Sequence, residues 1–71
     1  MKGEEKMGNT FQLIEVVGVS TVSFSDAVKV ALDEANKDNK VSWFEVIEQR
    51  GRINSKGEIE FQVTVKIGKK N

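Results

Sequence analysis

Apolar and polar residues alternate without a break over residues 58–67, near the C-terminal end of the chain. This period of two predicts a strand with one buried side and one solvent-facing side. Residues 10–17 and 41–50 are also rich in apolar and β-branched types, and they predict two further strands, the first of which we expect to end at Gly18. Residues 51–57 carry turn-forming types, so the last two strands are predicted to form a hairpin.

Residues 23–37 carry a helical period instead. Ser23 is a good N-cap residue, and Asp26 three positions later makes an approximate capping box. The apolar stripe of this helix is narrow and rich in alanine, so we expect the helix to lie close against a sheet. The members of the stripe are Phe24, Ala27, Val28, Ala31, Leu32 and Ala35.

The order strand, helix, strand, strand predicts an α+β fold of the β-α-β-β type. A hairpin joins the last two strands and a helix joins the first two. A three-stranded antiparallel sheet therefore has its last strand in the centre, in the order 1-3-2, with the helix on one face. We expect residues 1–9 to form a mobile tail, residues 10–68 the folded domain and residues 69–71 a C-terminal tail.

Self-association is expected for two reasons. A domain of this size buries only about 60% of the surface that its unfolded chain exposes, and without cysteine the chain has no disulfide to stabilise it. The predicted sheet also keeps two open edges and one uncovered face, which invite pairing with another chain.

The chemistry available to the chain is narrow. Cysteine and histidine are both absent, which excludes thiolate catalysis, the commonest general base and the usual zinc ligands. Eleven basic residues balance eleven acidic ones, and a net charge of zero argues against a nucleic-acid-binding protein. No apolar run approaches the length of about 18 residues that spans a membrane. We therefore expect a cytoplasmic protein that is not an enzyme, holds no metal and binds neither nucleic acid nor membrane.

Two residues are candidate ligand contacts. Trp43 is the only tryptophan, and its parity places it on the strand face that points away from the helix. Such an indole needs a further surface to cover it, which either a neighbouring subunit or a stacked flat ligand would supply. Gln62 lies mid-strand on the polar face of the last strand, where it is either an ordinary solvent-facing residue or a partner for the mixed donors and acceptors of a heterocycle.

The hairpin register places these two residues far apart. If the turn is centred between Ser55 and Lys56, Gln62 lies opposite Gln49, six residues along the strand from Trp43. At about 3.3 Å per residue, this separation is roughly 20 Å. One small ligand then reaches both residues only if they come from different subunits. A bulge beside a glycine of the turn would shift the register by about one residue without closing the gap. The same register pairs Phe44 with Ile67 and Val46 with Val65.

Three runs of sequence together resemble the dodecin family. They are WFEVIEQRGRI at 43–53, EFQVTVKIG at 60–68, and IEVVGVS at 14–20 leading into a helix near Ser23. The resemblance covers about residues 10–68. It implies a hollow homododecamer that stores or sequesters flavin and quenches its photochemistry without turnover. It also implies that flavins bind in pairs, sandwiched between tryptophans of symmetry-related subunits.

The resemblance assigns roles to four residues. Trp43 matches the stacking tryptophan, Gln62 the glutamine that hydrogen-bonds the isoalloxazine ring, Arg50 a basic residue placed to meet a ligand phosphate, and Glu48 an acid near the pocket. The implied cofactor is FMN, with riboflavin, FAD or coenzyme A as further ligands. Two other interpretations stay open: a structural or interaction module in which the tryptophan only packs an interface, and a coenzyme A or nucleotide carrier.

The turn before the helix departs from the family pattern. Val19 stands where many relatives have threonine, and Thr21 and Val22 replace a pair of acids that commonly follow. This departure leaves open whether the turn contacts a ligand. It does not affect the stacking residues.

Overall fold

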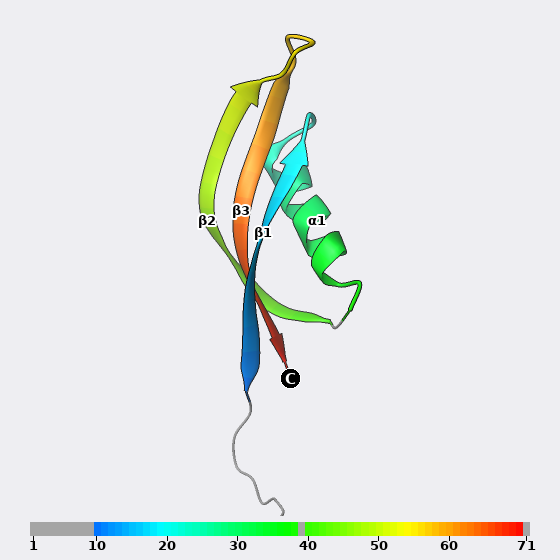
Figure 1. Cartoon of the computed structure of the whole chain (residues 1–71), viewed down its shortest axis with the longest axis vertical. Coiled ribbons are helices and arrows are strands. Elements are labelled where there is room, and N and C mark those ends of the chain that lie inside the picture. Colours follow the sequence, from blue (N-terminus) through cyan, green and yellow to red (C-terminus); the bar gives the residue numbers. More distant parts are fainter. Residues whose placement is uncertain (1–9, 39, 71) are drawn as a thin grey trace, which may run out of the picture.

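The computed structural model describes residues 10–38 and 40–70. The elements are strand β1 (Phe11–Ser20), helix α1 (Phe24–Ala35), strand β2 (Val41–Ile53) and strand β3 (Ile59–Lys70). The strands form one antiparallel sheet in the order β1-β3-β2, and α1 packs on one face of this sheet (Figure 1). The predicted β-α-β-β fold and its strand order are confirmed. The segment predicted as an N-terminal tail, residues 1–9, lies outside the described residues.

Two strands continue past the glycines at which the sequence predicts an end. β1 runs through Gly18, which pairs with Val63, and β2 runs through Gly51, which pairs with Phe61. Both predicted ends are wrong for the same reason. A glycine weakens a strand interior only modestly, and the neighbouring β3 offers it a continuous ladder of backbone hydrogen bonds.

β3 also extends further than the sequence predicts. Lys69 and Lys70, assigned by the sequence to a C-terminal tail, pair with Gln12 and Phe11 of β1. Val41 of β2 flanks Lys69 on the other side, so the central strand is paired on both sides at this end of the sheet. The polar composition of the segment conceals the strand, whose backbone is paired with β1 and, at Lys69, also with β2.

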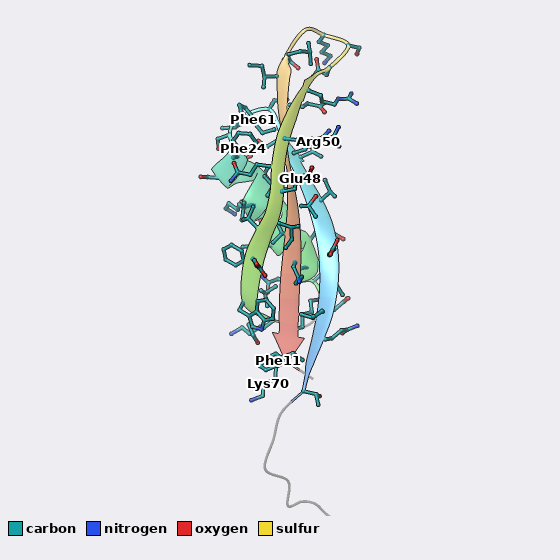
Figure 2. All side chains as sticks on the ribbon, turned by 90° about the vertical axis from the view of Figure 1, so that its left-hand side faces the viewer. Phe11, Phe24, Glu48, Arg50, Phe61 and Lys70 are labelled. Atoms are coloured by element: carbon teal, nitrogen blue, oxygen red, sulfur yellow. The ribbon has the colours of Figure 1, made fainter. Side chains whose placement is uncertain are left out.

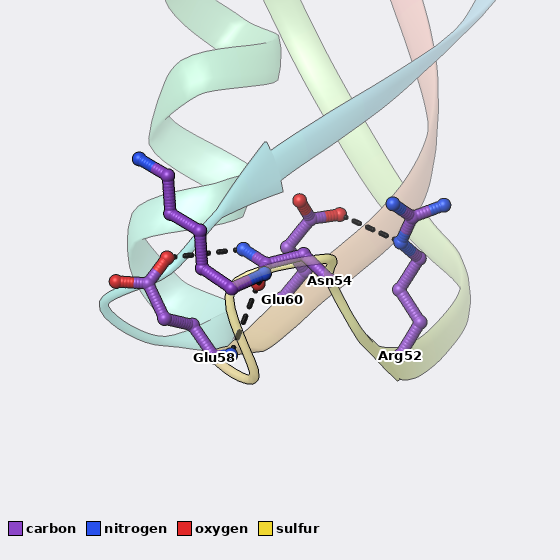
Figure 3. Close-up of polar contacts among 5 residues, drawn as sticks. Arg52, Asn54, Glu58 and Glu60 are labelled. Atoms are coloured by element: carbon purple, nitrogen blue, oxygen red, sulfur yellow. Dashed lines mark hydrogen bonds and ion pairs between the residues drawn. The ribbon is translucent and has the colours of Figure 1, made fainter.

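The turn between β2 and β3 is centred on Lys56, half a residue later than the sequence predicts. Ile53 pairs with Ile59, and the backbone N–H of Asn54 donates to the carbonyl of Glu58 at 2.9 Å. The Asn54 side-chain oxygen accepts from the backbone N–H groups of Lys56 at 2.9 Å and Glu58 at 3.0 Å (Figure 3). A loop with an odd number of residues shifts the hairpin register by one position next to the turn.

A β-bulge in β2 restores the predicted pairing further from the turn. Between Val46 and Glu48 the register shifts by one residue, so the bulge lies at Ile47 and not beside a glycine of the turn. Beyond it, the two predicted apolar pairs are present: Phe44 opposite Ile67 and Val46 opposite Val65.

The helix lies close on the sheet, as its alanine stripe predicts. A Cβ atom on Gly18 of β1 would overlap the backbone carbonyl of Ala27, so this position requires glycine for the helix to approach. The small side chains of the helix complete the close contact. The fully buried core consists of Ala27, Ala31 and Ala35 of α1 and Val63, Val65 and Ile67 of β3.

Hydrogen bonds hold the turn from β1 into α1. The backbone N–H of Asp26 donates to Oγ of Ser23 at 2.9 Å, which confirms Ser23 as the N-cap. The Asp26 carboxylate accepts from Oγ of Ser20 at 2.7 Å, and this Ser20 oxygen accepts from the N–H of Val22 at 2.9 Å. The second half of the predicted capping box is thus replaced by a hydrogen bond that ties the helix to the end of β1.

Apart from Val41, which packs against the core, the helix leaves β2 uncovered. Phe44 and Val46 lie on the helix side of the sheet by their register, yet they remain 47% and 37% exposed. The reason is visible in Figure 1, where α1 lies over β1 and β3 and away from β2. Every residue of β2 from Ser42 to Ile53 is exposed. This edge strand therefore presents apolar side chains that the described part of the chain does not cover.

Candidate ligand-binding face

We call the sheet face that points away from α1 the outer face. On β3 the residues Val63, Val65 and Ile67 are buried beneath the helix, so the residues between them point to the outer face. The register adds their partners on the two edge strands. The outer face thus carries Glu60, Gln62, Thr64, Lys66 and Gly68 of β3, Leu13, Glu15, Val17 and Val19 of β1, and Trp43, Glu45, Glu48, Arg50 and Arg52 of β2.

The bulge at Ile47 brings two of the predicted site residues to the outer face. Without it, Glu48 and Arg50 would share the parity of Phe44 and point to the helix side. The extra residue reverses that parity, and it places Glu48 opposite Thr64. Figure 2 shows Glu48 and Arg50 following one another along β2.

The sequence holds a signal for this bulge that parity counting misses. At even-numbered positions of β2 the side chains change from apolar, at Phe44 and Val46, to charged, at Glu48, Arg50 and Arg52. A change of phase in an alternating strand is the mark of an inserted residue. Read in this way, the sequence places the charged residues on the polar face.

Arg50 and Gln62 are direct cross-strand neighbours. The predicted pairing of Gln62 with Gln49 is wrong, because the odd-membered turn moves the register by one residue. Next to this pair, Nε of Arg52 lies 3.0 Å from Oε1 of Glu60 in a cross-strand ion pair (Figure 3). The structure therefore gathers a guanidinium and an amide at one end of the outer face, and Arg50 has no such ion pair among the described residues.

Trp43 lies at the other end of the outer face. It pairs with Gly68, six residues along β3 from Gln62, which corresponds to roughly 20 Å. The indole is 39% exposed. The sequence predicts both the face and the separation, and both are present. The structure thus brings Glu48, Arg50 and Gln62 together and leaves Trp43 apart from them.

The area between the two ends is mixed in character. Lys66 lies between Glu15 and Glu45, which pair with it from either side. On β1, Val17 and Val19 are exposed and give that edge an apolar surface. No enclosed pocket forms among residues 10–38 and 40–70. A ligand on this face would need a second surface to enclose it.

No group of three acidic side chains in the described part of the chain is placed to hold a metal ion. Among these residues no helix has the length and apolar character needed to cross a membrane.

The fold and its open outer face define the chain as a small α+β protein made of one β-α-β-β unit. Comparison with known proteins gives the family. The sequence model of dodecins matches residues 10–70. A dodecin of Thermus thermophilus is 38% identical over 63 residues, which cover 87% of this chain and 91% of the relative. The chain belongs to the dodecin family.

Solved structures agree with this assignment. Dodecin from Streptomyces coelicolor superposes with a TM-score of 0.81 at 33% identity, covering 93% of this chain and 96% of the other. The calcium dodecin of Mycobacterium tuberculosis superposes with a TM-score of 0.77 at 24% identity, covering 87% of this chain and 90% of the other. The second match shows the common fold alone.

Proposed function

We propose that this chain binds flavin, with FMN as the preferred ligand, in a hollow homododecamer where the flavin ring stacks on Trp43 at a subunit interface. The observation that carries the proposal is the exposed indole on an open sheet face. Flavins are planar, and a stacked aromatic pair contributes about 0.5–1.5 kcal/mol beyond the burial of its surface. Membership of the dodecin family supports the ligand class.

Several chains are needed to build such a site. One chain supplies no enclosed pocket within its described residues, and its indole lies roughly 20 Å from its own Arg50 and Gln62. An indole from one subunit and polar groups from a neighbour would meet around one ligand. The exposed apolar side chains of β2, among them Phe44 and Val46, supply surface for subunit contacts.

The polar groups present fit FMN in particular. The Gln62 amide offers both donors and acceptors to the edge of the isoalloxazine ring. Arg50 supplies a guanidinium for the phosphate, and charge-assisted hydrogen bonds of this kind are among the stronger ones in proteins. Glu48, on the same face as Arg50, borders this region. Riboflavin and FAD share the ring and would stack in the same way.

The proposed role is storage and protection, with no catalytic turnover. An indole in contact with an excited flavin donates an electron to it, and return of that electron restores both rings to the ground state. The cycle needs no proton-transferring side chain, which suits a chain without histidine or cysteine. Flavin held in this way is withheld from photochemistry with other molecules.

Titration of the purified apoprotein with FMN tests the proposal. We expect micromolar binding, strong quenching of the flavin fluorescence and a native mass of twelve chains. A dodecamer that leaves FMN fluorescence unchanged at micromolar ligand would instead support the structural module, with Trp43 buried by a neighbouring subunit.

A carrier of coenzyme A or another nucleotide is the remaining alternative. Such a ligand would use several cations, but the Arg52 guanidinium is already paired with Glu60 at 3.0 Å. This pairing leaves Arg50 as the available arginine of the cluster, which suits the single phosphate of FMN better.

Replacing Arg50 by alanine is expected to weaken FMN binding about tenfold more than riboflavin binding, because only FMN carries the phosphate. Isothermal titration of both ligands against the wild type and the variant measures the difference. Arg52→Ala is the matched control, since it removes the same charge from the same face but from a side chain already engaged with Glu60. Equal losses for the two flavins in Arg50→Ala would remove the phosphate role.

A further inference from the structure

Gly68 lies directly opposite Trp43 in the β2–β3 ladder. A Cβ atom built on Gly68 would overlap three indole atoms of Trp43, namely Cε2, Nε1 and Cζ2. The ring therefore covers the space in which a side chain at position 68 would stand. Gly68 is buried, whereas the tryptophan keeps an exposed part.

The backbone at this position does not itself require glycine. Among the described glycines the positive φ angle belongs to Gly57, at 78°, and Gly68 has an ordinary strand conformation. A side chain at Gly68 is thus excluded by the indole and not by the main chain. A glycine also lowers the stability of a strand. The contact with the indole of Trp43 accounts for the presence of Gly68 in the central strand.

We propose that Gly68 is a positioning residue for Trp43: one face of the indole rests on the bare backbone of Gly68, and the other face is held outward for a planar ligand. The inference deepens the proposed flavin function and rests on it for the identity of that ligand. Leu13 of β1 pairs with Gly68 from the other side of β3, and its side chain remains exposed.

Holding the ring flat has a consequence for binding. A side chain fixed in its bound orientation loses less conformational freedom when the ligand arrives. The protein therefore binds the ligand more tightly with a fixed ring than with a mobile one. With a methyl group at position 68 the indole has to rotate away from the sheet. The rotated ring offers the flavin less contact area, and both the affinity and the quenching of bound flavin decrease.

The decisive variant is Gly68→Ala in the full-length protein. We expect FMN and riboflavin to lose affinity equally, by about tenfold, because the change affects stacking and not the phosphate. We also expect bound FMN to keep more of its fluorescence than in the wild type. Gly51→Ala is the matched control, since its new Cβ would lie 3.4 Å from the Glu60 carbonyl oxygen and should leave binding within about twofold.

A measurement without flavin separates this inference from the proposed function. Acrylamide quenching of Trp43 fluorescence in the apoprotein should become more efficient in Gly68→Ala, because the second ring face becomes accessible. Unchanged quenching would overturn the positioning role, whatever the flavin affinity. Altered quenching together with a wild-type protein that binds no FMN would instead retain the positioning role and reject the flavin ligand.

The double variant Trp43→Ala/Gly68→Ala covers the case in which Gly68→Ala fails to fold. The new methyl group meets only the indole among its three nearest atoms, so removing the indole should restore folding. We expect the double variant to melt above Gly68→Ala and to match Trp43→Ala in FMN affinity. A double variant as unstable as Gly68→Ala would show that the glycine serves the backbone, and the inference would be wrong.

Discussion

Replacing Trp43 by alanine is expected to remove most of the affinity for FMN while the assembly remains intact. The indole lies on the outer face, and the atom positions around Gly68 show that it rests on main chain of its own subunit. On the proposed function, its loss would remove the stacking energy and the apolar contact that a bound flavin would make with the ring. Together these correspond to about 3 kcal/mol, or roughly 100-fold in the dissociation constant.

Fluorescence titration and native mass spectrometry on the same samples measure the two quantities separately. Trp43→Phe serves as the graded control, because it keeps a smaller aromatic face and should retain an intermediate affinity. Dissociation of the assembly in Trp43→Ala, with FMN binding intact in whatever assembly remains, would mean that the indole packs a subunit interface. The protein would then be better described as a structural module than as a flavin-binding protein.

The strand order and the position of the helix could be predicted from the sequence because each depends on a local period. The alternation over residues 58–67 identifies the central strand, and the alanine stripe identifies a helix that lies close to a sheet. The strand ends were less predictable. Gly18 and Gly51 suggest breaks when each strand is considered alone, but pairing with β3 carries both strands past them.

The site was partly predictable for a related reason. The face of Trp43 and its distance from Gln62 depend only on parity and rise per residue, which the sequence supplies. The pairing of Arg50 with Gln62 depends on the odd-membered turn, and the bulge at Ile47 then restores the predicted pairs beyond it. The register that pairs Phe44 with Ile67 also sets Trp43 opposite Gly68. The sequence does not give the side-chain conformation of Trp43, however, and that conformation decides whether the indole covers the glycine.

Replacing Gly18 by alanine is expected to destabilise the protein more than any other glycine-to-alanine change in the described chain. The new Cβ would overlap the backbone oxygen of Ala27 and crowd the Cβ of Ala31. A backbone atom cannot rotate away as a side chain can, so α1 would have to lift from the sheet. Overpacking of this kind costs about 3 kcal/mol, which lowers the melting temperature of a domain this small by roughly 12–24 °C.

Thermal melts at one protomer concentration test this expectation, because the stability of an assembly depends on concentration. Gly51→Ala is the tolerated control, and Gly57→Ala is intermediate, since open space surrounds it but its φ of 78° disfavours a side chain. A Gly18→Ala variant that melts within a few degrees of Gly51→Ala would contradict the close approach of helix and sheet. Because α1 packs on β1 and β3, nearly all of β2, the edge strand that carries Trp43 and Arg50, stays exposed.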